Sequence, residues 1–175
     1  MQNLMAQNND FNNFPLLSQN EFNDCCRLFV GRLHRAGLSA SICVLDEKSY
    51  VEISTVVQHF VYFTAHIVLS AVYSVPVLYF QAIRLDEEGN STPITKVSEL
   101  QDQFLATRAT ALHGSTVLTQ GEHPLTGLPW FFIHPCNTAE IMRDLNFNMT
   151  RVSFESYLPL WFGVVGPIVG FAIVD

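Results

Sequence analysis

The chain has 175 residues and a formal net charge of −7, and its composition is 49% hydrophobic, 12% aromatic and 14% charged. These values are typical of a compact globular protein, and the length suffices to bury a full core without a disulfide or a metal ion. The sequence contains no run of Lys or Arg, which phosphate binding requires. Nucleic acid is therefore not expected as a partner.

The beginning of the chain is polar and does not resemble a secretory signal. Residues 1–14 are rich in Asn and Gln, so we expect a flexible tail at 1–14 and a single domain over 15–175. Residues 1–26 contain no Lys or Arg. We therefore predict a cytoplasmic protein with free thiols. The four cysteines do not have zinc-binding spacing, so no metal site is predicted.

Local signals predict a first helix. Ser18 and Glu21 have the spacing of a capping box, in which each side chain accepts a hydrogen bond from a backbone N–H of the other residue. Apolar residues then recur at helical spacing up to Gly37, a residue typical of helix C-termini. This pattern places Cys25 and Cys26 in the core and favours a structural role over a redox role.

Strand-like segments follow the helix. Enrichment in β-branched and aromatic residues predicts strands over 41–45, 50–57, 60–72, 75–84 and 130–133. Residues 86–90 have the composition of a charged turn, and 114–129 that of a loop. Ser98 with Gln101 predicts a capping box for a short helix over 99–106. The antiparallel strands and flanking helices indicate an α+β fold.

Two helices are predicted near the end of the chain. The first begins after Cys136, with Asn137 as N-cap and Glu140 as its capping-box partner, and the second lies within 154–165. Residues 157–173 are apolar and uncharged, but the segment is short for a bilayer and is interrupted by Pro and Gly. It therefore predicts a core-packing helix with an extended end, not a membrane span.

Cys136 is the candidate for chemistry. It lies between a strand and a helix, where unpaired backbone N–H groups and the helix dipole favour a thiolate. Asn137 and Thr138 are candidates for stabilising an oxyanion. The position also suits a small, buried, unreactive cysteine, and the residues alone favour neither interpretation. His134 lies on extended chain before Cys136 and is interpreted as structural, not as a general base.

Spacing separates two classes of cysteine enzyme. A tyrosine-phosphatase loop needs Cys-x5-Arg, whereas Arg143 here gives Cys-x6-Arg, which excludes that class. All six histidines precede Cys136. A cysteine hydrolase is therefore left open only with its histidine before the cysteine, as His113 or His123 would be.

Three sequence blocks are 75–80 (VPVLYF), 122–138 (EHPLTGLPWFFIHPCNT) and 164–170 (VVGPIVG). In their order and joint occurrence they resemble the autophagy ubiquitin-like-conjugating enzyme family, whose active-site segment ends in His-Pro-Cys. The resemblance implies a ubiquitin-conjugating-enzyme-like fold, an antiparallel sheet flanked by an N-terminal helix and C-terminal helices. It favours the protein-acceptor branch of the family over the longer enzymes that conjugate lipid-linked modifiers.

The resemblance also implies a reaction. Cys136 would accept the C-terminal glycine of a ubiquitin-like modifier, autophagy-related protein twelve, as a thioester from an activating enzyme, autophagy-related protein seven. It would then pass the glycine to a lysine of autophagy-related protein five. No cofactor is implied, because the thioester itself carries the free energy. A non-catalytic protein-binding module with the same fold is the alternative.

One departure from ordinary ubiquitin-conjugating enzymes concerns the oxyanion. Those enzymes have Asn after a His-Pro pair, whereas Leu125 follows His-Pro here. The resemblance therefore leaves this role to Asn137, Thr138 or His134 near the cysteine, to Tyr79 on the central strand, or to the loop around Gln120.

Overall fold

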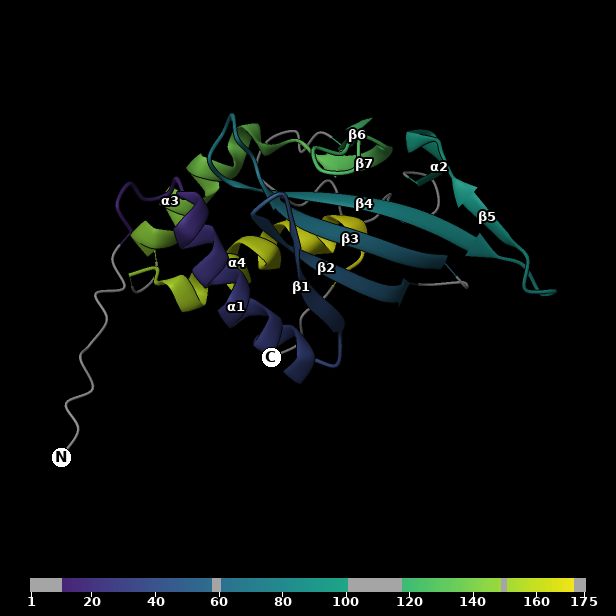
Figure 1. Cartoon of the computed structure of the whole chain (residues 1–175), viewed down its shortest axis with the longest axis horizontal. Coiled ribbons are helices and arrows are strands. Elements are labelled where there is room, and N and C mark those ends of the chain that lie inside the picture. Colours follow the sequence, from purple (N-terminus) through teal and green to yellow (C-terminus); the bar gives the residue numbers. More distant parts are fainter. Residues whose placement is uncertain (1–10, 58–60, 101–117, 149–150, 172–175) are drawn as a thin grey trace.

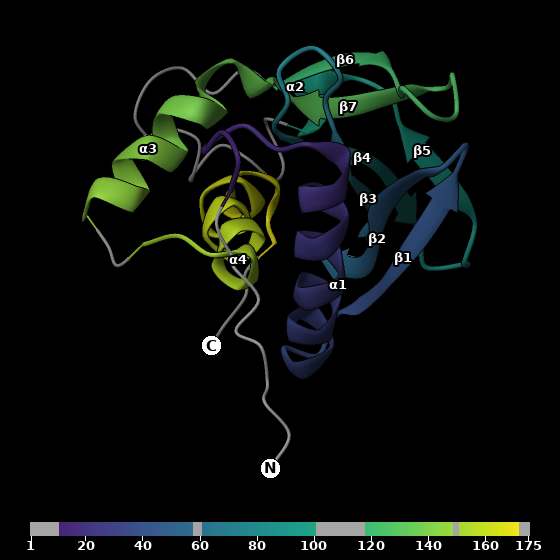
Figure 2. The same ribbon diagram turned by 60° about the vertical axis from the view of Figure 1, so that its left-hand side comes forward.

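A computed structural model describes residues 11–57, 61–100, 118–148 and 151–171. A seven-stranded antiparallel sheet carries α1 (Gln19–Arg35) and α4 (Phe154–Val165) side by side on one face (Figures 1 and 2). Helix α3 (Thr138–Asn148) lies at one end of the sheet (Figure 1). The predicted α+β arrangement, with an N-terminal helix and C-terminal helices flanking an antiparallel sheet, is confirmed.

The strands are β1 (Ser39–Leu45), β2 (Lys48–Val57), β3 (Val61–Leu69), β4 (Pro76–Leu85), β5 (Ser91–Ile94), β6 (Leu118–Glu122) and β7 (Pro129–Ile133). Their order is β1-β2-β3-β4-β7-β6. One edge of β4 is divided, because β7 pairs with Tyr79 and Phe80 while β5 pairs with 82–85. Strands β1, β2, β3, β4 and β7 match the predicted segments to within a few residues.

Two strands were not predicted. Strand β5 follows the charged turn, and β6 falls in the segment 114–129 that was expected to be a loop. The sequence of β6, Leu-Thr-Gln-Gly-Glu, has no apolar alternation and contains a glycine. Its extended conformation comes from pairing with β7 along its full length, from Leu118 with Ile133 to Glu122 with Pro129. Tertiary pairing thus overrides a weak local preference.

The first helix forms as predicted. Ser18 N–H donates to Glu21 Oε2 at 2.7 Å, and Glu21 N–H donates to Ser18 Oγ at 3.3 Å, which completes the capping box. Cys25 and Cys26 are fully buried core residues. Gly37 has φ +78°, the left-handed conformation that glycine adopts without a steric penalty.

The structured part of the chain begins before residue 15, where it was expected to begin. Phe11 packs edge-on against Phe154 at 4.6 Å between ring centroids, and both Phe11 and Phe14 contact Tyr157. Asn12 N–H donates to Glu21 Oε1 at 2.7 Å. Residues 11–14 are therefore part of the packed fold, while 1–10 lie outside the described residues.

The short helix predicted over 99–106 begins earlier than expected. Helix α2 spans Val97–Leu100, so Ser98 lies inside it and is not its N-cap. Leu100 is fully buried, which anchors this turn to the core. The remainder of the predicted segment, 101–106, lies outside the described residues.

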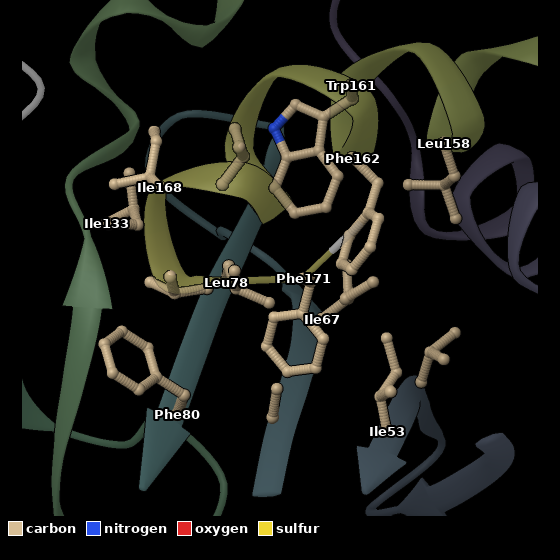
Figure 3. Packing of buried hydrophobic residues seen from close by; sticks show 14 of the residues in the cluster. Ile53, Ile67, Leu78, Phe80, Ile133, Leu158, Trp161, Phe162, Ile168 and Phe171 are labelled. Carbon is tan, nitrogen blue, oxygen red and sulfur yellow. The ribbon is translucent and has the colours of Figure 1, made fainter. Parts of the chain in front are cut away.

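The core lies between the sheet and the two helices α1 and α4 (Figure 3). Helix α4 contributes Trp161 and Phe162, which are each 1% exposed, and Phe171 contacts Phe162 at 5.7 Å between ring centroids. The expected extended end is wrong: 166–169 form a 3-10 turn, η3, that ends at Gly170 with φ +88°. Within the residues described, no helix is both long and apolar enough to span a bilayer.

Two glycines near the end of α4 are expected to respond oppositely to alanine. A Cβ on Gly166 would lie 2.9 Å from Phe162 Cε1, whereas a Cβ on exposed Gly163 would meet nothing within 4 Å. Gly166→Ala should destabilise the fold by about 1–3 kcal/mol through overpacking. Gly163→Ala should stabilise it by about 0.5–1 kcal/mol through helix propensity. Urea titrations give both values, and shifts of the same sign would contradict this packing.

Candidate active site

Cys136 lies on an exposed turn between β7 and α3. The strand ends at Ile133, a 3-10 turn, η2 (Pro135–Asn137), follows, and α3 begins at Thr138. Cys136 is exposed, whereas Pro135 and Thr138 on either side are buried. Two buried neighbours thus anchor the backbone while the thiol faces solvent. This geometry excludes the interpretation of Cys136 as a small buried core residue.

His134 holds the backbone of this turn. Its Nδ1 accepts a hydrogen bond from Cys136 N–H at 3.2 Å, which makes His134 the N-cap of η2. The prediction of Asn137 as N-cap is therefore wrong, because the helical turn starts earlier, with Pro135 at its first position. Proline suits that position because its φ is fixed and the missing N–H is not needed there. Since Nδ1 accepts, neutral His134 carries its proton on Nε2.

Of the other predicted site residues, Asn137 and Thr138 directly follow Cys136, whereas Tyr79 is linked to the turn through other aromatic rings. Asn137, inside η2, is half-buried, and Thr138 is 6% exposed, with its backbone N–H donated to Pro135 O. Tyr79 stacks on Phe132 at 5.2 Å between ring centroids. Phe132 in turn contacts the His134 ring at 6.3 Å.

An aromatic residue that sequence reasoning missed lies beside His134. The ring of Tyr73, in the turn between β3 and β4, meets the His134 ring nearly perpendicularly at 5.7 Å. Tyr73 is 42% exposed and its neighbour Val72 is 85% exposed. No local motif marks this contact, because β3 and β4 bring the turn to the site only through their pairing.

His123 is unavailable as a base for a cysteine hydrolase. The residue is fully buried, and its Nδ1 accepts the backbone N–H groups of Leu125 and Thr126 at 3.2 and 3.3 Å. Its Nε2 lies 3.1 Å from His66 Nδ1. Both ring nitrogens are therefore engaged away from the thiol. Burial lowers the pKa of His123 to about 4, and His66 adds to this effect. His113 lies outside the described residues.

The chain matches the family model described as "Autophagocytosis associated protein, active-site domain" over residues 39–175. The chain belongs to this family. The match contains all three sequence blocks noted above and the turn that carries Cys136.

Related proteins carry one printed name, "Ubiquitin-like-conjugating enzyme ATG10". The relative from Homo sapiens is 32% identical over 128 residues, which cover 72% of this chain and 56% of the relative. The relative from Arabidopsis thaliana is 35% identical over 123 residues, covering 64% and 50%. The chain thus spans about half the length of the curated relatives it matches.

Two solved structures share the fold. "Solution structures of KmAtg10" aligns with a TM-score of 0.62 at 19% identity, covering 91% of this chain and 99% of that one. "Crystal structure of Autophagic E2, Atg10" aligns with a TM-score of 0.61 at 16% identity, covering 90% and 99%. The predicted resemblance to the autophagy ubiquitin-like-conjugating enzyme family is confirmed, with autophagy-related protein ten as the member that the chain is similar to, and the conjugating-enzyme fold that the resemblance implied is confirmed as well.

The cysteines of this family member are expected to differ sharply in reactivity. Burial raises the pKa of the Cys25 thiol to about 12, and it raises that of Cys26 as well. Cys43 is half-buried and Cys136 is exposed. Iodoacetamide at neutral pH, followed by peptide mass spectrometry, should label Cys136 first, Cys43 more slowly, and Cys25 and Cys26 only on unfolding. Equal labelling of the four thiols would contradict the burial described.

Proposed function

We propose that this chain is a ubiquitin-like-conjugating enzyme of autophagy, a transferase that carries its modifier as a thioester on Cys136. One observation carries the proposal: within an active-site-domain family, an exposed cysteine lies on a turn held by its own N-cap residue. The name of the relatives, "Ubiquitin-like-conjugating enzyme ATG10", supports the same reaction class. The cytoplasm is the proposed location.

The reaction has two acyl transfers. The Cys136 thiolate attacks the carbonyl carbon of the modifier's C-terminal glycine, which is held as a thioester on the activating enzyme. A tetrahedral oxyanion forms and collapses, and the activating enzyme's thiolate leaves. An acceptor lysine amine then attacks the new thioester, the isopeptide bond forms, Cys136 leaves as a thiolate, and the amine proton passes to solvent. An exposed turn suits both steps, because each partner must reach the sulfur.

The proposed partners follow from the resemblance. The activating enzyme is autophagy-related protein seven, the modifier is autophagy-related protein twelve, and the acceptor is autophagy-related protein five. The thioester supplies the driving force in both steps, so the proposal includes no cofactor or metal.

Asn137 is the better supported of the oxyanion candidates. It neighbours the thiol and is half-buried, so its amide can meet an incoming carbonyl group. Thr138 is buried and its N–H is already donated, and the Nδ1 of His134 accepts from Cys136 N–H, which leaves His134 only its Nε2–H as a donor. Tyr79 is tied to the turn through the Phe132 ring. Asn137→Ala should therefore slow thioester formation on the order of 10²-fold in single-turnover assays, and a rate within twofold of wild type would remove Asn137 from this role.

A charging reaction tests the proposed function. The chain is incubated with the activating enzyme, ATP and the modifier, and the products are separated on non-reducing and reducing gels. The expected product is one ATP-dependent adduct that a thiol reductant removes. A protein that binds the modifier but forms no such adduct would instead be the non-catalytic binding module.

A further inference from the structure

A buried hydrogen-bond chain of Glu52, His66 and His123 crosses the sheet face opposite α1 and α4. His66 Nε2 lies 3.1 Å from Glu52 Oε2, and His66 Nδ1 lies 3.1 Å from His123 Nε2. His66 is 5% exposed and His123 is fully buried, while the Glu52 side chain reaches the surface at 39% exposure. These residues come from β2, β3 and the turn after β6, so no local sequence motif joins them.

The partners at the two ends of this hydrogen-bond chain fix the position of each proton. The Glu52 carboxylate only accepts, so His66 must donate from Nε2 and accept at Nδ1. His123 therefore donates from Nε2, which leaves its Nδ1 to accept from Leu125 and Thr126 N–H. Both histidines are thus neutral Nε2–H tautomers. The opposite tautomer of His123 would point an N–H at two backbone N–H groups.

Aromatic contacts connect His123 to the cysteine turn. Its ring meets Tyr79 nearly edge-on at 4.9 Å, and Tyr79 stacks on Phe132 at 5.2 Å with an interplanar angle of 29°. Phe132 contacts the ring of His134 at 6.3 Å, and His134 holds Cys136 N–H. A chain of direct contacts therefore runs from a surface carboxylate to the backbone of the candidate nucleophile.

We infer that Glu52 and His66 are positioning residues for thioester transfer: Glu52 orients His66, which accepts from His123 Nε2–H and so holds that ring, the turn 123–128 and Tyr79 in place beside the cysteine segment. This role rests on the proposed function. Neither residue touches the reacting atoms. Their contribution is the fixed geometry of the sheet end from which η2 begins, because a small misplacement of a reacting group lowers a rate steeply.

Glu52→Lys tests the inference at a position whose side chain reaches the surface. A lysine ammonium only donates, so it cannot accept from His66 Nε2–H, whereas a glutamine could still accept through its Oε1 and leave both tautomers in place. We expect the imidazole 15N shifts of wild-type His66 and His123 to report Nε2–H tautomers, and those of His66 in the variant to move away from that tautomer. We also expect single-turnover charging to slow on the order of tenfold, as positioning of a histidine by a carboxylate matters for rate.

The matched control is Glu47→Lys, which makes the same change of charge at an exposed position on the same hairpin. It should leave both the 15N shifts and the charging rate at wild-type values. Unchanged shifts in Glu52→Lys would overturn the role of Glu52 in orienting His66. Changed shifts with an unchanged rate would overturn the positioning role and leave a purely structural chain. A wild-type protein that forms no thioester would instead refute the proposed function, whatever the spectra show.

Discussion

Cys136→Ala should abolish the thiol-sensitive adduct completely, because no other described cysteine combines exposure with a position at the start of a helical turn. Cys25 and Cys26 are fully buried, and Cys43 is a half-buried residue of β1. Loss of the attacking sulfur removes the covalent step itself, so the rate should fall below detection. The measurement is the charging reaction with activating enzyme, ATP and modifier.

Two further variants make this result specific. Cys136→Ser should replace the thioester with an oxyester that survives thiol reductant, because a serine hydroxyl at the same place attacks slowly and forms a less reactive ester. Cys43→Ala removes a thiol of intermediate exposure and should charge like wild type. If Cys136→Ala still charged while Cys43→Ala did not, the nucleophile would have been assigned to the wrong cysteine.

Mild acid should destabilise the fold by about 2 kcal/mol between pH 7 and pH 5, and by on the order of 3 kcal/mol when pH 4 is reached. Burial lowers the pKa of His123 to about 4, and its ordinary value is 6.5. The unfolded chain therefore binds a proton that the folded chain excludes in this interval. The stabilisation is complete above pH 6.5 and is lost as the pH falls towards 4. His66, whose pKa burial also lowers, acts in the same direction.

One carboxylate and several aromatic rings surround the His66–His123 pair. Glu52 partly offsets the lowered pKa of His66, Tyr50 and Trp130 pack against the His66 ring, and Tyr79 and Trp130 pack against that of His123. Urea titrations over pH 5–7 should show the slope in wild type and a clearly smaller slope in His123→Gln. His34→Gln, at an exposed position, should retain the wild-type slope. Equal slopes in all three would contradict the assignment.

Elements with strong local signals could be predicted from the sequence. The Ser18–Glu21 capping box marks the start of α1, and runs of β-branched and aromatic residues mark β3 and β4. Strand β6 could not be predicted, because its polar sequence becomes extended only by pairing with β7. Prediction thus succeeded where a short segment determines its own conformation.

The candidate site likewise contains features that local sequence determines and features that depend on tertiary packing. Cys136 stands out in its motif, but its exposure follows from the packing of Pro135 and Thr138. The N-cap was misassigned because Asn is a preferred capping residue, although a proline at the first helical position marks the residue before it, His134, as the cap. The contact between His66 and His123 joins positions 57 residues apart and has no local signal.

The divided edge of β4 gives one strand two different neighbours on the same side. Its first half lies between β3 and β7, which leads directly to the cysteine turn, whereas its second half lies between β3 and the short strand β5, which extends past the rest of the sheet (Figure 1). Strand β3 pairs with β4 along both halves, from Leu69 with Pro76 to Val61 with Arg84. A slip of β4 by one residue would therefore break its pairing with three strands at once, so the position of Tyr79 opposite Phe132 is locked by β3 and β5 as well as by β7.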